Sequence, residues 1–199
     1  NDILDLSKIE AGKLVLEQTD FALGTVLDQV RSLIAEPART KGLTVTVDSD
    51  DLPLWLRGDP TRLRQALLNY AANAVKFTAA GHVDLRARLL EESEHGLLVR
   101  FEVEDTGPGI APERLPGLFR AFEQGDASTA RQYGGTGLGL ATVYGFAHQS
   151  KGAVALASQP GEGTTVSLYL PSPEPTGVEA AADASRARST VPKGLSVLL

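Results

Sequence analysis

Residues 69–78 read NYAANAVKFT, a segment whose polar residues recur at helical spacing. Asn69 and Asn73 are four residues apart, so a helix places them on one face, and Lys76 follows three residues later. Such a face is often merely solvated, but asparagine is a poor helix former, and two on a Leu/Ala helix indicate a function. An amide oxygen can bind a hard cation such as Mg²⁺, and the lysine can bind phosphate.

The surrounding sequence predicts where this helix begins and what flanks it. Gly58-Asp59-Pro60 is a helix start, with Asp59 as the N-cap and Pro60 in the first turn, and the helix should run to about Lys76. The same kind of pattern predicts helices over about 1–11, 23–41 (with Pro37 as a possible kink), 115–122 and 137–150. Strands are predicted over about 13–17, 43–47, 82–90, 97–103, 153–157 and 164–170, the third and fourth forming a hairpin.

A glycine cluster, GGTGLG at residues 134–139, directly precedes an apolar helical run. Exposed backbone N–H groups at a helix N-terminus can bind phosphate oxygens. The cluster matches neither the P-loop pattern nor the dinucleotide-binding pattern GxGxxG. Taken alone, it fits a phosphate-binding loop and a mobile connecting loop equally well.

A second cluster, DTGPGI at residues 105–110, follows a predicted strand. The Asp105 carboxylate could accept a hydrogen bond from an exocyclic amine, as a pocket that selects adenine requires. Taken alone, a tight turn in which Asp105 caps its own backbone is the better interpretation.

Composition narrows the possible functions. The 199 residues carry a formal net charge of −6 with a pI of about 5.1, which argues against nucleic-acid binding. The absence of cysteine excludes disulfides, thiolate metal sites and a thiol nucleophile. No apolar run approaches the length of a membrane span.

Five motifs together are far more specific than any one of them. In chain order they are NYAANAVKFT (69–78), DTGPGI (105–110), LFRAFEQ (118–124), GGTGLGL (134–140) and GEGT (161–164). This order resembles the catalytic domain of sensor histidine kinases over about residues 1–170. The resemblance implies the Bergerat fold, a two-layer α/β sandwich in which helices back a mixed, mostly antiparallel sheet.

The resemblance also implies ATP and Mg²⁺ as ligands and gives roles to individual residues. Asp105 should receive the adenine amino group, with Thr164 helping through water, and Asn73 should bind Mg²⁺. Asn69 and Lys76 should act at the phosphates as the catalytic pair. The other implied nucleotide contacts are Phe77, Gly107, Gly109, Ile110, Gly135, Thr136, Gly137, Leu138 and Gly139. A lid would span about residues 122–135; because many relatives carry arginine where this chain has Gln124, Arg131 is a candidate substitute for reaching the γ-phosphate.

The resemblance implies a domain order as well. We expect residues 1–12 to end a dimerisation helix, 13–171 to form the catalytic domain, 172–194 to be a linker and 195–199 to begin a receiver domain of a hybrid kinase. The acceptor histidine would then lie before residue 1, and His82, His95 and His148 are interpreted as ordinary surface histidines. The fragment should bind ATP without phosphorylating itself.

The expected partners follow from this reading. They are the phosphoacceptor histidine domain, of the same or a partner chain, and a response regulator or receiver domain. We expect no nucleic acid, a homodimeric full-length protein and a cytoplasmic location.

Two other functions remain open. ATP hydrolases of the same superfamily typically have glutamate at the position of Asn69, and an amide cannot act as that general base. A degenerate kinase that only docks partners is disfavoured by the intact Asn73, Asp105 and glycine motifs. A measurement of Mg-ATP binding would distinguish such a degenerate kinase from an active one.

Overall fold

The structure is a computed structural model that describes residues 15–49, 52–53, 55–94, 96–115 and 137–175. The elements in chain order are β1 (Thr19–Ala22), α2 (Leu23–Thr40), β2 (Thr44–Asp48), β3 (Trp55–Gly58), α3 (Pro60–Phe77), β4 (His82–Ser93), β5 (Gly96–Asp105), a 3-10 turn (Pro112–Arg114), α6 (Gly137–Gln149), β6 (Ala153–Gln159) and β7 (Gly163–Ser172).

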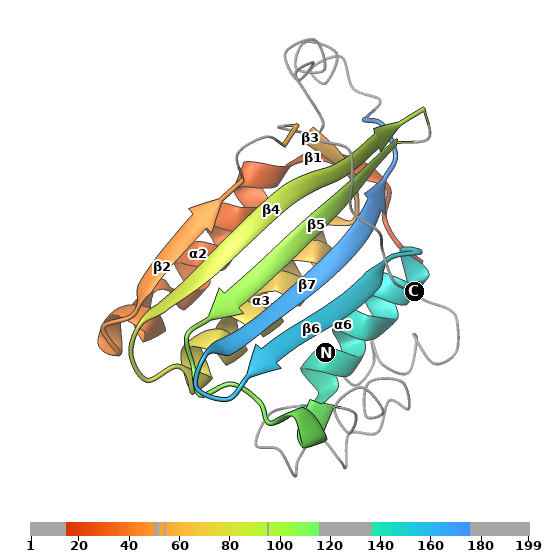
Figure 1. The fold of residues 1–199 in the computed structure, drawn as a ribbon. Coiled ribbons are helices and arrows are strands. Elements are labelled where there is room, and N and C mark those ends of the chain that lie inside the picture. Colours follow the sequence, from red (N-terminus) through yellow and green to blue (C-terminus); the bar gives the residue numbers. More distant parts are fainter. Residues whose placement is uncertain (1–14, 50–51, 54, 95, 116–136, 176–199) are drawn as a thin grey trace.

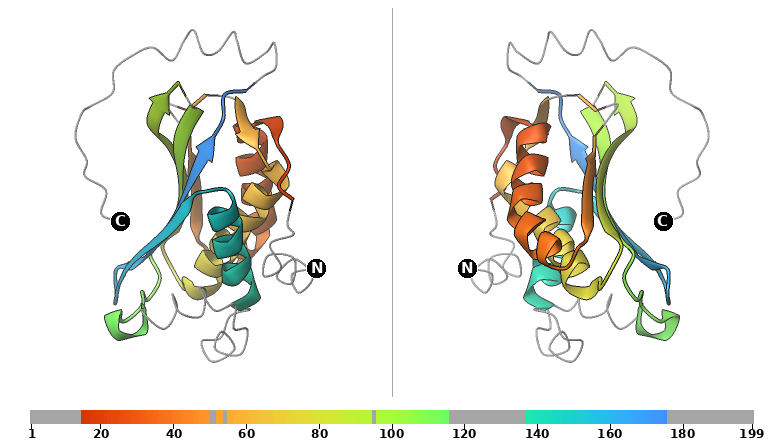
Figure 2. Two further views of the ribbon diagram at one scale, coloured as in Figure 1. Left: turned by 90° about the vertical axis from the view of Figure 1, so that its right-hand side faces the viewer. Right: turned by 90° about the vertical axis from the view of Figure 1, so that its left-hand side faces the viewer.

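Five strands form one sheet in the order β2-β4-β5-β7-β6 (Figure 1). β2 runs parallel to β4, and the remaining neighbours are antiparallel. The helices α2, α3 and α6 lie on one side of this sheet, and no helix of the described residues covers its other side, called the open side here (Figure 2). The predicted fold class, a two-layer α/β sandwich with a mixed and mostly antiparallel sheet, is therefore confirmed.

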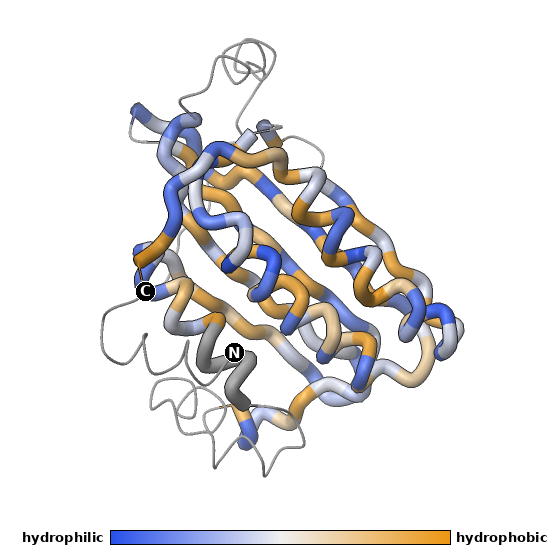
Figure 3. The backbone as a smooth tube through the Cα atoms, turned by 180° about the vertical axis from the view of Figure 1, so that it is seen from behind, coloured by the Kyte–Doolittle hydropathy of each residue, from blue (hydrophilic) through white to orange (hydrophobic). Residues whose placement is uncertain are grey.

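The core lies between the two layers. Hydrophobic and hydrophilic residues alternate along the strands and recur at helical spacing in the helices, as the view from the helical side shows (Figure 3). The fully buried side chains at the centre include Val30, Leu67, Val83, Phe101 and Leu168. Because inward positions of both layers are apolar, burial of this surface holds helices and sheet together.

The start of α3 was predicted correctly. The Asp59 side chain accepts a hydrogen bond from the Arg62 N–H at 2.9 Å, and Pro60 occupies the first turn. The second Asp59 oxygen accepts the backbone N–H of Glu17 at 3.2 Å, so the cap also holds the segment that leads into β1.

The predicted strand over residues 13–17 is wrong for residues 15–17, which are not in a strand. The strand lies later, at β1, and pairs antiparallel with β3, which the sequence analysis missed. Each of these strands has four residues. Segments this short carry too little alternation to predict a partner from sequence, so the pairing is a property of the tertiary structure.

The β4–β5 hairpin is longer than predicted. Pairing continues through the polar residues Glu91, Glu92 and Ser93, with a bulge between Leu89 and Glu91. Backbone hydrogen bonds do not need apolar side chains, so the ladder extends past the hydrophobic run. The other helices and strands agree with prediction to within a few residues, except that the helix over 1–11 and residues 116–122 lie outside the described residues.

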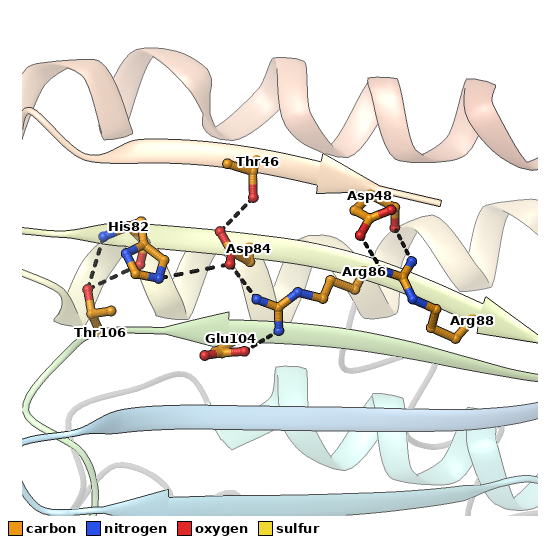
Figure 4. Close-up of polar contacts among 8 residues, drawn as sticks. All are labelled: Thr46, Asp48, His82, Asp84, Arg86, Arg88, Glu104 and Thr106. Atoms are coloured by element: carbon orange, nitrogen blue, oxygen red, sulfur yellow. Dashed lines mark hydrogen bonds and ion pairs between the residues drawn. The ribbon is translucent and has the colours of Figure 1, made fainter. Parts of the chain in front are cut away.

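The open side of the sheet is lined by charged side chains (Figure 4). Arg86 bonds Asp84 at 2.6 Å and also contacts Glu104 on the next strand, while Arg88 pairs with Asp48. These side chains alternate with the apolar ones of the core, as expected for a sheet with one solvated side. Among the described residues, moreover, no helix combines the length and the apolar character that a bilayer crossing needs.

Candidate functional site

Asp105 is the last residue of β5. It lies where the ends of neighbouring strands meet the end of a helix. It pairs with Val83 on β4 and with Thr164 on β7. A Cβ atom built on Gly107, two residues later, would lie 3.2 Å from Thr78 Oγ1 and 3.6 Å from the Phe77 carbonyl oxygen at the end of α3. The tertiary structure therefore brings the 69–78 and 105–110 motifs together.

The Asp105 carboxylate is held by backbone donors. The Gly107 N–H donates to Oδ1 at 2.8 Å. Burial of the carboxyl group raises the pKa of Asp105, whereas hydrogen bonds from the backbone N–H groups of Gly107 and Thr164 lower it. Asp105 is thus a half-buried, oriented acceptor, which suits it to receive a hydrogen bond from a ligand donor.

Thr78 was part of the quoted helix motif but received no role from sequence. Its side chain is completely buried, and its hydroxyl oxygen has no hydrogen-bond partner of ordinary geometry among the described residues. A Cβ atom on Gly107 would lie 2.7 Å from Asp105 Oδ1 and 3.2 Å from Thr78 Oγ1, so the carboxylate and the hydroxyl border the same small space. Burial raises the pKa of Asp105, and the Thr78 hydroxyl opposes that shift. A buried hydroxyl without a partner is costly, which indicates that this spot is completed by a further group or water.

The first and last glycine motifs pack backbone against backbone. A Cβ atom on Gly109 would lie 1.9 Å from the Gln159 carbonyl oxygen, and one on Gly163 would lie 1.8 Å from the Asp105 carbonyl oxygen. Gly109 and Gly163 also have φ angles of 68° and 104°. Only glycine fits such positions, so both have a structural requirement of their own beside any ligand contact.

Ser158 joins these loops and was missed by sequence reasoning. Its Oγ accepts the Ile110 N–H at 2.8 Å and donates to the Gly163 carbonyl oxygen at 2.8 Å. It also lies 2.9 Å from Thr164 Oγ1, and because its one proton goes to Gly163, Thr164 is the donor there. A serine three residues before the GEGT motif was the available signal, but serine beside a turn is too common to stand out.

A further hydrogen bond holds the loop that follows Asp105. The Thr106 hydroxyl accepts the backbone N–H of His82 at 3.0 Å, at the start of β4 (Figure 4). A Cβ atom on Gly81 would lie 2.1 Å from this hydroxyl, so the glycine leaves room for it. Thr106 thereby fixes the loop to the neighbouring strand.

The predicted polar face of α3 is present. Asn69 and Asn73 are half-buried, whereas Lys76 and Phe77 are exposed, with 46% of Phe77 accessible. Lys76 Nζ lies 5.0 Å from the centre of the Phe77 ring, a cation–π contact. Lys76 and Phe77 are the last two residues of α3, directly before Thr78, and Asn73 and Asn69 lie one and two turns earlier on the helix.

Several predicted contacts cannot be placed. Arg131, Gly135 and Thr136 lie outside the described residues, as does the lid over 122–135. Gly137 begins α6, and Leu138 and Gly139 are in its first turn. α6 packs against α3.

Neither a metal cluster nor the cavity near the start of α3 marks this site. Within the described ranges, no group of three or more His, Cys, Asp or Glu residues could hold a metal ion. A cavity of about 60 Å³ lies at the opposite end of α3, near Leu16, Asp59, Phe146 and Ser172, and no predicted site residue lines it. The site is defined instead by convergent polar groups and close-packed loops at the Asp105 end of the sheet.

Comparisons with known proteins agree with this geometry. The sequence model of the family described as "Histidine kinase-, DNA gyrase B-, and HSP90-like ATPase" matches residues 58–174. The chain is 45% identical over 174 residues to the sensor protein GacS of Pseudomonas syringae pv. syringae, covering 86% of this chain and 19% of GacS. It is 41% identical over 171 residues to the signal transduction histidine-protein kinase BarA of Escherichia coli K12, covering 85% of this chain and 19% of BarA. The chain thus spans about a fifth of the length of these relatives.

Solved structures show the same fold. Full-length ShkA, crystallised with AMPPNP, aligns with a TM-score of 0.75 and 36% identity, over 87% of this chain and 35% of ShkA. The catalytic domain of the histidine kinase ThkA aligns with a TM-score of 0.63 and 22% identity, over 78% of this chain and 95% of that domain.

Proposed function

Since this chain belongs to the family of histidine kinase-, DNA gyrase B- and HSP90-like ATPases, we propose that it is the Mg-ATP-binding catalytic domain of a sensor histidine kinase. The domain would span residues 13–171 and transfer the γ-phosphoryl group of ATP to a histidine of a dimerisation domain. The observation that carries the proposal is the convergence of Asp105, Thr78 and Thr164 beside the polar end of α3.

Asp105 would recognise adenine. A carboxylate accepts hydrogen bonds only, so it matches the exocyclic amine of adenine and disfavours the carbonyl that guanine carries at the same position. The backbone donors of Gly107 and Thr164 already orient the carboxylate, so little freedom would be lost on binding. Thr164, bonded to Ser158, would help through water, and Gly107, Gly109 and Ile110 would border the base.

The phosphates would lie toward α3 and α6. Lys76 and Asn69 would face them, Phe77 would border the nucleotide, and backbone N–H groups over residues 135–139 would bind phosphate oxygens at the N-terminus of α6. Arg131 would reach the γ-phosphate. Positive charge from Lys76 and the helix dipole suits a ligand that is strongly anionic.

The donor set fits Mg²⁺ better than a transition metal. Mg²⁺ takes oxygen ligands and needs few from protein when phosphates and water supply the rest, so the Asn73 amide oxygen could serve as its protein ligand. When bound, Mg²⁺ would neutralise charge on the transferring phosphoryl group.

The proposed reaction breaks the bond between the γ-phosphorus and its bridging oxygen and forms a bond from phosphorus to a histidine ring nitrogen. ADP leaves with the bond electrons, and the histidine nitrogen loses its proton to a base outside this chain. The phosphoryl group would then pass to an aspartate of a response regulator or receiver domain. Asn69 cannot deprotonate water, which favours transfer over hydrolysis.

The full-length protein that contains this domain can also be described as a proposal. We propose that the domain belongs to a dimeric hybrid kinase and lies in the cytoplasm. The similarity to the sensor protein GacS and the signal transduction histidine-protein kinase BarA, of which this chain spans about a fifth, supports the signalling-kinase part of this proposal.

The decisive experiment has two stages. Calorimetric titration with Mg-ATP should show saturable binding, which Asp105→Asn weakens about tenfold or more and Asp48→Asn, on the open side of the sheet, leaves unchanged. The chain should then transfer label from γ-labelled ATP to a separately supplied dimerisation domain, but not to itself. Binding with steady phosphate release and no transfer would support a hydrolase instead.

A further inference from the structure

The ammonium group of Lys41 lies at the C-terminal end of α3, although Lys41 belongs to the end of α2. Its Nζ donates to the carbonyl oxygens of Val75 at 2.7 Å, Lys76 at 2.6 Å and Thr78 at 3.2 Å. The last carbonyls of a helix have no N–H partner within the helix, and they carry its partial negative charge. Lys41 therefore caps a helix other than its own.

The base of the Lys41 side chain is fixed. Its backbone N–H donates to the Ala38 carbonyl oxygen at 3.1 Å, and Gly42, with a φ of 68°, ends α2. The next residue, Leu43, is buried and donates its N–H to Ala38 at 2.9 Å. The backbone thus aims the cation at α3, whereas most surface lysines point into solvent.

The last turn of α3, which Lys41 contacts, contains residues of the proposed nucleotide site. Lys76 and Phe77 are exposed there, and Thr78 follows with its hydroxyl buried beside Gly107 and facing Asp105. The Thr78 N–H donates to Ala74 at 3.0 Å, so its backbone continues the helix end, while its side chain turns toward the sheet. A shift of this turn would move the Thr78 hydroxyl away from the carboxylate.

We propose that Lys41 is a positioning residue for the nucleotide site, and that it acts by fixing the end of α3 so that the Thr78 hydroxyl stays against the Asp105 carboxylate. This inference rests on the proposed function, because it gives Lys41 and Thr78 a role in recognising the adenine base. Thr78 supplies a second polar group beside Asp105, and Lys41 touches neither the base nor the phosphates.

The test compares Lys41→Met with Arg39→Ala in the whole chain. Methionine keeps the unbranched stem and removes the ammonium group. Arg39 is a matched control because it lies in the last turn of the same helix and carries the same charge. Among the described residues, its side chain pairs with Glu36 of that helix. Lys41→Met should weaken Mg-ATP binding about two- to fivefold, the range expected for one charged cap at a helix end, and Arg39→Ala should not.

A second comparison separates positioning from general stability. Thr78→Val removes the hydroxyl at nearly constant shape, and it should lower the preference for ATP over GTP, as should Lys41→Met. If Lys41 acts through Thr78, the effects of the two substitutions should not add. The variant that carries both should then bind ATP about as weakly as whichever single variant has the lower affinity. Hydrogen exchange should also show faster opening of the Thr78 amide in Lys41→Met without nucleotide.

The outcomes are distinguishable. Equal ATP affinity and selectivity in Lys41→Met and the unaltered chain, with only a lower melting temperature, would refute the inference and leave the proposed function standing. Additive effects in the double variant would refute the route through Thr78. Failure of the unaltered chain to bind Mg-ATP would refute the proposed function and this inference with it.

Discussion

Asp105 and Thr164 lie directly opposite each other on β5 and β7, and the Thr164 N–H donates to the Asp105 carboxylate. The same ladder brings the Asp105 carbonyl oxygen so close to Gly163 that no side chain fits there. One strand register therefore sets both the orientation of the acidic group and the packing of the last glycine motif.

Asp105→Asn should separate binding from stability. Mg-ATP affinity should fall about tenfold or more, because a hydrogen bond to a charged acceptor contributes roughly 1.5–3 kcal/mol. The melting temperature at neutral pH should not fall, because burial raises the pKa of Asp105 and the ionised form is the disfavoured one in the folded state. Calorimetry and thermal unfolding on the same sample would check both; a variant that binds normally but melts early would contradict the assignment.

The pH dependence of ATP binding should report the Asp105 carboxyl group. Its pKa is raised, so protonation begins at higher pH than for an ordinary aspartate, whose pKa is about 3.9. Affinity should therefore decline as the pH falls toward the raised pKa, since only the ionised form accepts the amine. The stability contribution has the opposite sign, being present at low pH and lost as pH rises through the folded-state pKa. Titrations of Asp105→Asn, which lacks this group, give the baseline to subtract.

Gly163→Ala and Gly161→Ala form a matched pair in one turn. Both glycines have positive φ angles, 104° and 84°, so each alanine strains the backbone by about 1–2 kcal/mol. At Gly163 the new Cβ would also meet the Asp105 carbonyl oxygen, adding roughly 1–3 kcal/mol of overpacking, whereas nothing lies within 4 Å at Gly161. Urea unfolding should show the larger loss at Gly163. Equal losses would mean that the close approach to Asp105 is not what requires glycine.

Ser158→Ala should destabilise the joined loops by about 1–3 kcal/mol, the cost of leaving buried polar groups without partners. It removes the bond partner of the Ile110 N–H and of the Gly163 carbonyl oxygen. Ser167→Ala is a suitable control, since that buried hydroxyl donates a hydrogen bond to Glu102 at 3.2 Å within the sheet and not in the loops. Denaturant unfolding of both variants, with ATP titration as a second measurement, would show whether the loops depend on Ser158.

Asn73→Ala should weaken Mg-ATP binding while leaving adenosine binding unchanged. Asn73 is proposed as the protein ligand of Mg²⁺, and adenosine has no phosphates and needs no metal. The measurement is the ratio of ATP affinities with Mg²⁺ and with a chelator, which should approach one in the variant. A ratio equal to that of the unaltered chain would show that another residue binds the metal.

The comparison of expectation with structure shows which features are local. The N-cap of α3 at Asp59 and the spacing of Asn69 and Asn73 depend on residues within a few positions of one another, and both were predicted. The β1–β3 pair was not, because its two four-residue strands meet across a long stretch of chain. The roles of residues 131–136 stay predictions, since those residues are outside the described ones.

The sequence by itself determined the family and the elements other than β1 and β3, because helical and strand periodicities are local and five motifs stand in a specific order. Only the tertiary structure decided how the motifs meet. It placed the Thr78 hydroxyl and the Asp105 carboxylate on either side of Gly107, the Lys41 ammonium group on the end of α3 and Ser158 between two loops. These contacts join residues from different elements, so they depend on strand register and on helix packing against the sheet, which no local pattern encodes.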